Sequence, residues 1–400
     1  MRVLSLAGIT LLALLGCSAS SNAVATNEVE AAQGRSRAAD AASVHAAPTP
    51  EGTRPFQTAV VADFQAPWAM TFLPDRRMLV TEKAGQLLLV GADGRQRVQV
   101  AGVPPVDSEG QGGLMDVVLH PQFASNGQVY LSASQRGPGG KGVVLMRGRL
   151  VEAGGAARLD GLATIFRATP FIEDSGHYSG RIAFSPDGQH LFFTNGERQQ
   201  FEPAQDKRAT LGKVLRLTPD GRPAPGNPLA AQGFHPAIWS YGHRNLLGIA
   251  FDGAGNLWQQ EMGPRHGDEL NLVLPGRNYG YPRVSNGDHY DGRNIPDHKA
   301  GDGYEAPKVW WNPAISPAGL MIYSGSLFPQ WRGSAFIGAM NEPGVVRVPL
   351  NGTSAGQPQF WDIDGARIRE VEQGPDGAIY LLEDGRRSSQ GRLLRLTPSR

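Results

Sequence analysis

The sequence predicts an all-β protein built from one repeated unit. Each copy holds an apolar residue, a turn rich in Pro, Asp and Gly, an apolar strand with a polar end, and a second apolar strand. The turns fall at residues 74, 121, 186, 252, 329 and 375. A unit of 46 to 77 residues with several strands is the signature of a propeller blade. The six copies therefore predict a six-bladed β-propeller of four-stranded antiparallel blades.

The composition agrees with this fold class. The 52 glycines and 30 prolines are spread along the 400 residues, which is typical of many short strands joined by turns. No segment shows a sustained helical period. A pair of packed β domains is the competing fold, but it does not explain the repeat. The net charge of +1 argues against nucleic acid as a partner, because proteins that bind it usually carry a basic excess.

The expected strands can be placed copy by copy. The first three copies give strands at 78–82 with 86–90, at 128–132, and at 191–195 with 213–217. The last three give strands at 257–260, at 334–338 with 345–348, and at 378–382 with 392–396. These runs are continuously apolar, as expected for inner strands that neighbouring blades cover on both faces. A further strand at 58–61 is expected to join the last copy and close the ring. The longer middle intervals are expected to form loops at one end, where binding sites usually lie.

The N-terminus predicts export. Residues 1–17 include an apolar run from 3 to 15, which is too short to span a bilayer comfortably and is typical of a signal peptide. The run ends in Leu14-Leu15-Gly16-Cys17, which resembles a bacterial lipobox, and Cys17 is the only cysteine. This predicts a periplasmic protein without disulfides that contacts the membrane only through a lipid on Cys17. An ordinary signal peptide with a chance cysteine is the alternative.

Residues 18–55 are predicted to be a flexible tether. They contain no aromatic side chain and are rich in Ala, Ser and Thr, so they bury too little apolar surface to fold. A marginal Ala-rich helix at 29–42 is the alternative. The globular domain is then expected at 56–400.

The loop region from 241 to 282 carries the densest set of candidate site residues. His243-Arg244-Asn245 precedes an apolar strand, and Glu261-Met262-Gly263-Pro264 opens a loop that also carries carboxylates. The backbone carbonyls of Gly263 and Pro264 are oxygen ligands of the kind that calcium takes. Glu269 and Tyr279 either serve a second calcium or brace the turn. Cations and carboxylates this close together indicate a rim that holds a charged ligand.

A histidine and three arginines complete the candidate residues. His177 stands in a glycine-flanked loop before the strand of the third copy. Histidine is the usual general base near neutral pH, and a hydrogen-bonded rim residue is the alternative. Arg367 and Arg369 share one face if their segment is extended. With Arg244 they indicate a polyanionic ligand, because arginine forks suit carboxylates; solvated surface charges are the alternative.

Several blocks of the chain, taken in order, resemble one known family. They are 110–114 with 120–123, 177–181, 211–217 with 226–228, 242–245, 261–264, 278–282 and 367–370. Together they resemble the soluble, PQQ-dependent glucose/sorbosone dehydrogenase family, and most closely its bacterial aldose sugar dehydrogenases. The resemblance covers residues 56–398. It implies a six-bladed propeller that binds pyrroloquinoline quinone (PQQ), a tricarboxylate, with calcium (Ca²⁺) over the central channel.

The resemblance also implies a role for each candidate residue. His177 would take the proton from the anomeric hydroxyl of an aldose sugar, and Gln111 would lie near that hydroxyl. Arg244, with calcium, would polarise the quinone. Asn245, Arg367 and Arg369 would join Arg244 in binding the cofactor, and the carbonyls of Gly263 and Pro264 would bind calcium. The implied reaction oxidises C1 of the sugar to a lactone and passes electrons to an external acceptor, such as a periplasmic cytochrome or quinone.

The chain departs from the family's glucose-oxidising members at three places. Gly176 stands where those members have an acidic residue before the histidine, although Asp174 is close by. The segment 341–344 lacks their cofactor-binding lysine and contains Glu342 instead, so Arg386 or Arg387 is a candidate substitute. The segment 312–317 replaces their aromatic wall beside the substrate, so the substrate range is not transferable. A calcium-dependent lactonase-type hydrolase and a non-catalytic propeller that binds a carbohydrate or protein are the rival functions.

Overall fold

The computed structural model describes residues 43–385 and 390–399, all within the unit Ala42–Arg400. The predicted signal peptide with Cys17, the candidate helix at 29–42, and Arg386 and Arg387 lie outside the described residues. No helix among the described residues is long and apolar enough to cross a membrane.

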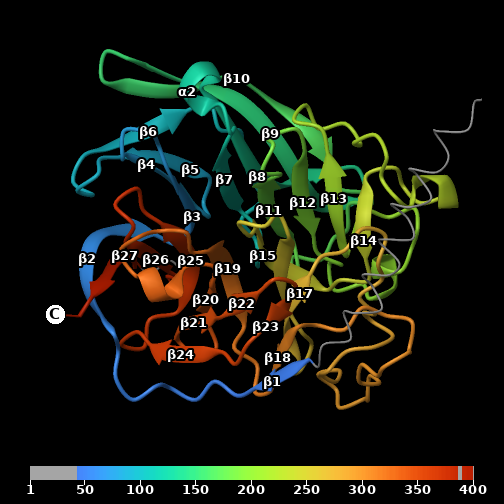
Figure 1. Ribbon diagram of the computed structural model, residues 1–400. Helices are drawn as coiled ribbons and strands as arrows, with labels where there is room; N and C mark the ends of the chain where they lie inside the picture. Colours follow the sequence, from blue (N-terminus) through green and yellow to red (C-terminus); the bar gives the residue numbers. More distant parts are fainter. Residues whose placement is uncertain (1–42, 386–389, 400) are drawn as a thin grey trace, which may run out of the picture. The chain divides into compact units, whose positions relative to one another are not determined.

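Nearly all regular structure in the described residues is β, which confirms the predicted class (Figure 1). The exceptions are one short helix, α2 (Phe123–Asn126), and three 3₁₀ turns at Glu202–Ala204, Ala230–Gln232 and Pro329–Trp331. Every turn expected from the repeat lies between two antiparallel strands of one sheet. In the third turn, for example, the Asp187 carboxylate accepts from the Gln189 N–H at 3.0 Å, and Gly188 takes a φ of 69°.

The strands form sets of four that follow one another along the chain. The first two sets are β3 (Pro67–Phe72), β4 (Met78–Glu82), β5 (Gln86–Val90) and β6 (Arg97–Ala101), then β7 (Leu114–Leu119), β8 (Gln128–Gly137), β9 (Gly140–Ala153) and β10 (Ala156–Arg167). The next two are β11 (Ser179–Phe184), β12 (Leu191–Asn195), β13 (Lys213–Leu217) and β14 (Ile238–Tyr241), then β15 (Asn245–Phe251), β16 (Leu257–Met262), β17 (Asp268–Leu272) and β18 (Val309–Trp311).

The last two sets complete the described sheets. They are β19 (Pro317–Ile322), β20 (Ala335–Ala339), β21 (Gly344–Val348) and β24 (Gln359–Asp362), then β25 (Ile368–Gln373), β26 (Ile379–Glu383), β27 (Gln390–Pro398) and β2 (Phe56–Gln65). A small hairpin, β22 (Leu350–Asn351) with β23 (Ser354–Ala355), stands apart. One feature differs from isolated four-stranded sheets: β6 pairs in parallel with the long β10, which joins the first two sets into one sheet of eight strands.

The strand expected at 58–61 joins the last set, as predicted. It is part of β2, which pairs antiparallel with β27, so that Thr58 lies opposite Leu396 (Figure 1). Contacts between the first strands of the sets also run in a closed cycle, from β3 through β7, β11, β15, β19 and β25 back to β3. The two ends of the domain are therefore held together by backbone hydrogen bonds.

The end of the predicted tether differs from expectation. Residues 44–46 form a strand, β1 (Val44–Ala46), which pairs in parallel with β18 at the edge of the fourth set. The His45 ring stacks on Trp310 with 4.1 Å between the ring centroids, and Ala46 is buried. The domain therefore begins before residue 56. Composition missed this strand because its few apolar residues, Val44 and Ala46, pack in a cluster with residues that lie far away in the sequence.

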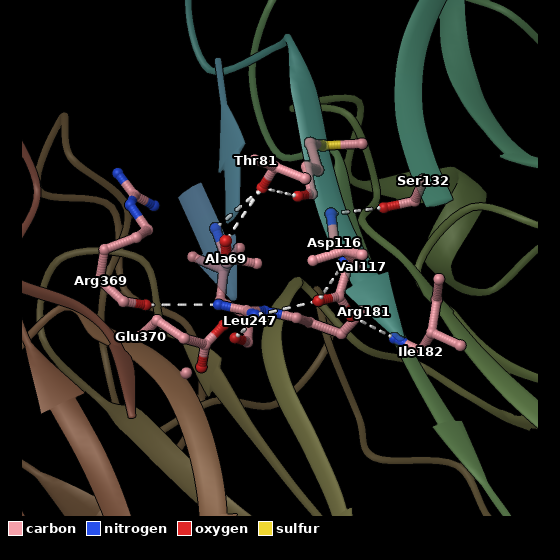
Figure 2. A network of polar contacts seen from close by, with 12 residues as sticks. Ala69, Thr81, Asp116, Val117, Ser132, Arg181, Ile182, Leu247, Arg369 and Glu370 are labelled. Atoms are coloured by element: carbon pink, nitrogen blue, oxygen red, sulfur yellow. Dashed lines mark hydrogen bonds and ion pairs between the residues drawn. The ribbon is translucent and has the colours of Figure 1, made fainter. Parts of the chain in front are cut away.

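An arginine links the first strands where they converge (Figure 2). Arg181 of β11 is buried and donates from Nε to the Leu247 carbonyl of β15 at 2.8 Å. Its other nitrogens contact the carboxylates of Asp116 on β7 and Glu370 on β25, and the Arg369 carbonyl. The guanidinium also lies over the Trp68 ring of β3, 4.1 Å from its centroid. One cation thus ties five strands from different sets together.

Candidate active site

Loops and strand ends from every set border a large cavity, called here the main cavity, of about 770 Å³. It brings together four of the predicted site residues: Gln111, Asn245, Arg367 and Arg369. Two further charged residues, Lys83 and Asp384, line the same cavity. With three cations and one carboxylate among its lining residues, the main cavity suits an anionic ligand.

Arg367 and Arg369 share one face of their segment, as their spacing predicted. Both guanidiniums bind the carboxylate of Asp384, with Arg367 Nη2 at 3.0 Å and Arg369 Nη2 at 2.8 Å from separate oxygens. Arg367 also donates to the Met340 carbonyl at 2.6 Å. Burial raises the pKa of Asp384, but the charges and hydrogen bonds of the two arginines outweigh it, and the net pKa is lowered. The pair therefore keeps a net positive charge.

His177 lies in a second, smaller pocket of about 220 Å³, called here the histidine pocket. Arg244 lines it as well, and so do Glu197, Phe201 and Tyr290. The His177 backbone N–H donates to Gln111 Oε1 at 2.8 Å, and since Gln111 lines the main cavity, this hydrogen bond links the linings of the two spaces. The predicted neighbours His177, Gln111 and Arg244 are thus close together.

The partner of His177 is Glu197, which the sequence did not single out. The His177 Nδ1 contacts Glu197 Oε1, and the second oxygen of this carboxylate accepts from the Phe201 N–H at 2.7 Å. Burial raises the pKa of Glu197, but the hydrogen bond and charge of His177 lower it and outweigh burial. The net pKa is below the ordinary value, so Glu197 is ionised. An ionised carboxylate accepts, so Nδ1 carries the imidazole proton and Nε2 is left as an acceptor.

The protonation state of His177 follows from its surroundings. Burial is the largest influence and lowers its pKa, and the charge of Arg244 acts in the same direction. The hydrogen bond to Glu197 opposes them, but the net pKa is below the ordinary histidine value. His177 is therefore neutral at pH 7 and able to take up a proton. Asp174, the acidic residue nearest in sequence, contacts Gln200 instead.

Arg244 is held at the junction between the histidine pocket and the loop that follows β16. Its Nη1 donates to the carbonyls of Met262, at 3.0 Å, and Gly263, and its backbone N–H donates to Glu261. Its buried Nε has no partner in the described residues. The neighbouring Asn245 amide has a weak contact at 3.7 Å to the Met262 sulfur. Both residues keep hydrogen-bonding capacity for a ligand.

The candidate calcium ligands lie around a very small pocket of about 10 Å³. Gly263, Pro264, Glu269 and Tyr279 all line it, so the structure brings the predicted set together. Gly263 is held in place by its N–H, which donates to Asp268 Oδ1 at 2.8 Å. The described residues contain no group of three or more His, Cys, Asp or Glu side chains arranged to hold a metal. A calcium ion here would therefore rely on backbone carbonyls as well as carboxylates.

The side chains of Glu269 and Tyr279 have protein partners already. Glu269 is buried and accepts from Asn271 Nδ2 at 3.0 Å; burial and the nearby Glu261 raise its pKa well above the ordinary value. The Tyr279 hydroxyl donates to the Leu272 carbonyl at 2.5 Å and accepts from the Leu274 N–H at 2.8 Å. These two hydrogen bonds brace the turn, which is one of the two roles expected for Tyr279.

The other two departures noted in the sequence, at 341–344 and 312–317, have structural counterparts. Asn341 is exposed, and its amide donates to the Ala314 carbonyl at 3.2 Å. The segment 312–317 contributes Ser316 to the lining of the main cavity and contributes no aromatic ring to it. Aromatic rings come instead from Phe201 and Tyr290 at the histidine pocket. Tyr290 lies in the long loop between β17 and β18, where no sequence pattern marked it.

Sequence comparisons place the chain in a family. The family model described as Glucose / Sorbosone dehydrogenase matches residues 64–395. The aldose sugar dehydrogenase YliI of Escherichia coli (strain K12) is 39% identical over 339 residues, which is 83% of this chain and 90% of that protein. Quinoprotein glucose dehydrogenase B of Acinetobacter calcoaceticus is 28% identical over 304 residues, 70% of this chain and 62% of that protein. The chain therefore belongs to the glucose/sorbosone dehydrogenase family.

Solved structures agree with the family. The apo form of the soluble aldose sugar dehydrogenase from Escherichia coli matches with a TM-score of 0.80 at 37% identity, over 86% of this chain and 100% of that chain. The PQQ-bound form of the aldose sugar dehydrogenase from Streptomyces coelicolor matches with a TM-score of 0.70 at 29% identity, over 88% and 100%. The resemblance stated from the sequence blocks is confirmed.

Proposed function

We propose that this protein is a PQQ- and calcium-dependent dehydrogenase that oxidises the C1 hydroxyl of aldose sugars to lactones and passes the electrons to an external acceptor. The observation that carries the proposal is the His177–Glu197 pair beside a cavity with surplus positive charge. Family membership and the PQQ-bound relative support the cofactor. The strand sets and the cycle of first-strand contacts further support six blades around a central channel.

The main cavity fits a tricarboxylate such as PQQ. Its volume of about 770 Å³ falls within the usual range of ligand sites. Arg367 and Arg369 would bind carboxylates of the cofactor, and the amide of Asn245 would donate to it. PQQ, when bound, supplies the quinone that accepts a hydride from the sugar. The carbonyls of Gly263 and Pro264 would hold calcium, which supplies a Lewis acid.

The chain's own residues supply the proton chemistry. His177 Nε2 would accept the proton of the C1 hydroxyl, and Glu197 would stabilise the imidazolium that forms. Gln111, through its contact with the His177 backbone, would keep this histidine in place and lie near the same hydroxyl. The fixed charge of Arg244 would favour negative charge that develops on the neighbouring ligand, because it is held in position before the reaction.

The histidine pocket is the proposed sugar site. Three large hydrophobic side chains are exposed in the described residues, and two of them, Phe201 at 40% and Tyr290 at 72%, border this pocket. Sugar rings present C–H faces that pack on aromatic rings, and exposed aromatic side chains often mark binding sites. Asp291 and Arg293 add polar groups for the hydroxyls. The substrate would therefore lie between the two rings with C1 facing His177.

The location and the redox partner are part of the same proposal. The apolar run at 3–15 and Cys17 support export to the periplasm and a lipid anchor. The electrons would then pass to a periplasmic cytochrome or a quinone, since the enzyme must be reoxidised between turnovers. Electrophoretic shift and mass analysis of the membrane fraction, with Cys17→Ser as control, would test the anchor.

The deciding experiment measures dye-linked dehydrogenase activity of the full chain prepared without cofactor. A panel of aldoses is assayed before and after addition of PQQ with calcium, and His177→Ala is assayed alongside. Activity that appears only on reconstitution and is lost in His177→Ala is the expected result. Protein that binds no PQQ would overturn the proposal and favour a non-catalytic propeller. Hydrolysis of lactones without PQQ would instead favour the hydrolase.

A further inference from the structure

Lys83 is a cation of the main cavity that no predicted role uses. It lies in the turn between β4 and β5, in the first set, whereas Arg367 and Arg369 come from the last set. The two sets are neighbours, because β25 contacts β3. Lys83 therefore faces the arginines across the boundary where the ring closes.

The backbone of Lys83 is fixed on both sides. Its N–H donates to the Ala66 carbonyl at 3.0 Å, and its carbonyl accepts from the Leu114 N–H at 3.1 Å. A close approach reinforces this position: a Cβ added to Gly113 would lie only 2.4 Å from the Lys83 carbonyl oxygen. The side chain thus starts from a rigid point on the cavity wall.

Lys83 differs from the two arginines in its partners. Arg367 and Arg369 both pair with Asp384, so one carboxylate already serves two cations. Within residues 43–385 and 390–399, Lys83 makes no ion pair, and its Nζ donates to the Gly110 carbonyl at 3.1 Å. Burial and the charge of Arg369 lower the pKa of Lys83, which indicates that the Lys83 ammonium group is close enough to Arg369 to be repelled by it. An anion in the cavity would relieve this unfavourable position.

The segment 341–344 does not fill this role. Asn341 is exposed and uncharged, and Glu342 would repel a carboxylate. Lys83 is thus the third positive side chain among the described residues that line the main cavity. Because Lys83 and the arginines belong to neighbouring sets, an anion with several carboxylates can contact both.

We propose that Lys83 binds a carboxylate of the cofactor and replaces, from another blade, the lysine that segment 341–344 lacks. The inference rests on the proposed function, since it takes PQQ as the anion. It predicts that the charge of Lys83 contributes to affinity, and not to the fold or to proton transfer.

The test is an equilibrium titration of the full chain with PQQ in the presence of calcium, followed by quenching of protein fluorescence. Lys83→Met removes the charge, Lys83→Arg keeps it, and Lys83→Gln is a second neutral variant. Lys299→Met, an exposed lysine outside the cavity, is the matched control. Loss of a charge-assisted hydrogen bond should weaken PQQ binding about 10- to 100-fold in both neutral variants. Lys83→Arg and Lys299→Met should stay within about threefold of wild type.

The trimethyl ester of PQQ separates a charge effect from a general disturbance. The ester carries no carboxylate, so Lys83→Met should weaken PQQ binding and leave ester binding unchanged. Equal weakening of PQQ binding and ester binding, or unchanged PQQ binding in both neutral variants, would overturn the role of Lys83. The proposed function would not be affected by either result. Wild-type protein that binds no PQQ would overturn the proposed function, and this inference with it.

Discussion

His177 and His243 are both buried and both stand next to a glutamate, but only His177 has the geometry of a base. Both follow a glycine, as Gly176-His177 and Gly242-His243. His243 is fully buried, its Nε2 contacts Ser240 Oγ at 2.9 Å, and its Nδ1 lies 3.5 Å from Glu261. Its ring also stacks on Tyr279. Both of its nitrogens therefore face protein groups.

His177 has one nitrogen committed and the other available. Its Nδ1 contacts Glu197, while its side chain borders the histidine pocket. Burial lowers the pKa of both histidines, and that of His243 falls to about 3, with the charge of Lys213 adding to the effect. A low pKa alone therefore does not distinguish a base from a structural residue. Access of the second nitrogen to a pocket does.

The largest expected effect belongs to the histidine that faces the pocket. His177→Ala should lower kcat by roughly 10²- to 10⁴-fold, because general base catalysis contributes about that much. PQQ binding should change little, whereas the thermal midpoint should fall, because the buried carboxylate of Glu197 loses its partner. Steady-state kinetics of the reconstituted enzyme and a PQQ titration check both points. Equal activity in the variant would contradict the comparison.

The second test concerns the partner of His177. Glu197→Gln should lower kcat on the order of 10²-fold or more, since the imidazolium loses its stabilising charge. The hydrogen bond to Glu197 raises the pKa of His177, so its removal should lower that pKa further. The acidic limb of the kcat/KM profile should therefore move to lower pH. A limb that stays fixed or moves to higher pH would rule out His177 as the titrating base.

The third test removes the structural histidine. His243→Leu should lower the free energy of unfolding by about 1–3 kcal/mol, because Ser240 and Glu261 lose a buried partner. Urea denaturation of the apo protein measures it. Activity of the folded variant should stay within about threefold of wild type, since both ring nitrogens of His243 face protein groups. An unchanged free energy of unfolding would contradict a structural role for His243.

The smallest effect is expected at the rim of the histidine pocket. Tyr290→Ala should raise KM for the aldose about three- to tenfold, as expected for loss of one aromatic contact. The side chain is 72% exposed, so stability and PQQ affinity should stay the same. Tyr290→Phe, which keeps the ring, is the matched control. A change in kcat alone, with KM unaffected, would place Tyr290 outside the sugar site.

The sequence by itself determined the features that depend on neighbouring residues. Apolar runs and Pro/Asp/Gly turns predicted the strands and the hairpins, and the strand at 58–61 closes the last sheet as expected. The spacing of Arg367 and Arg369 predicted a shared face, which their common partner Asp384 confirms. These predictions succeed because alternation along a strand and turn chemistry are local properties of the chain.

Only the tertiary structure decided which side chains are partners. Glu197 and Asp384 were not singled out in the sequence; each follows a strand of the repeat, and that position is the one signal that could have found them. Glu197, not Asp174, contacts His177, and Lys83 shares a cavity with arginines nearly 300 positions later in the chain. Such pairings arise when loops from different sets converge, and no spacing along the chain encodes them. The choice between a base and a core histidine depends on the same convergence.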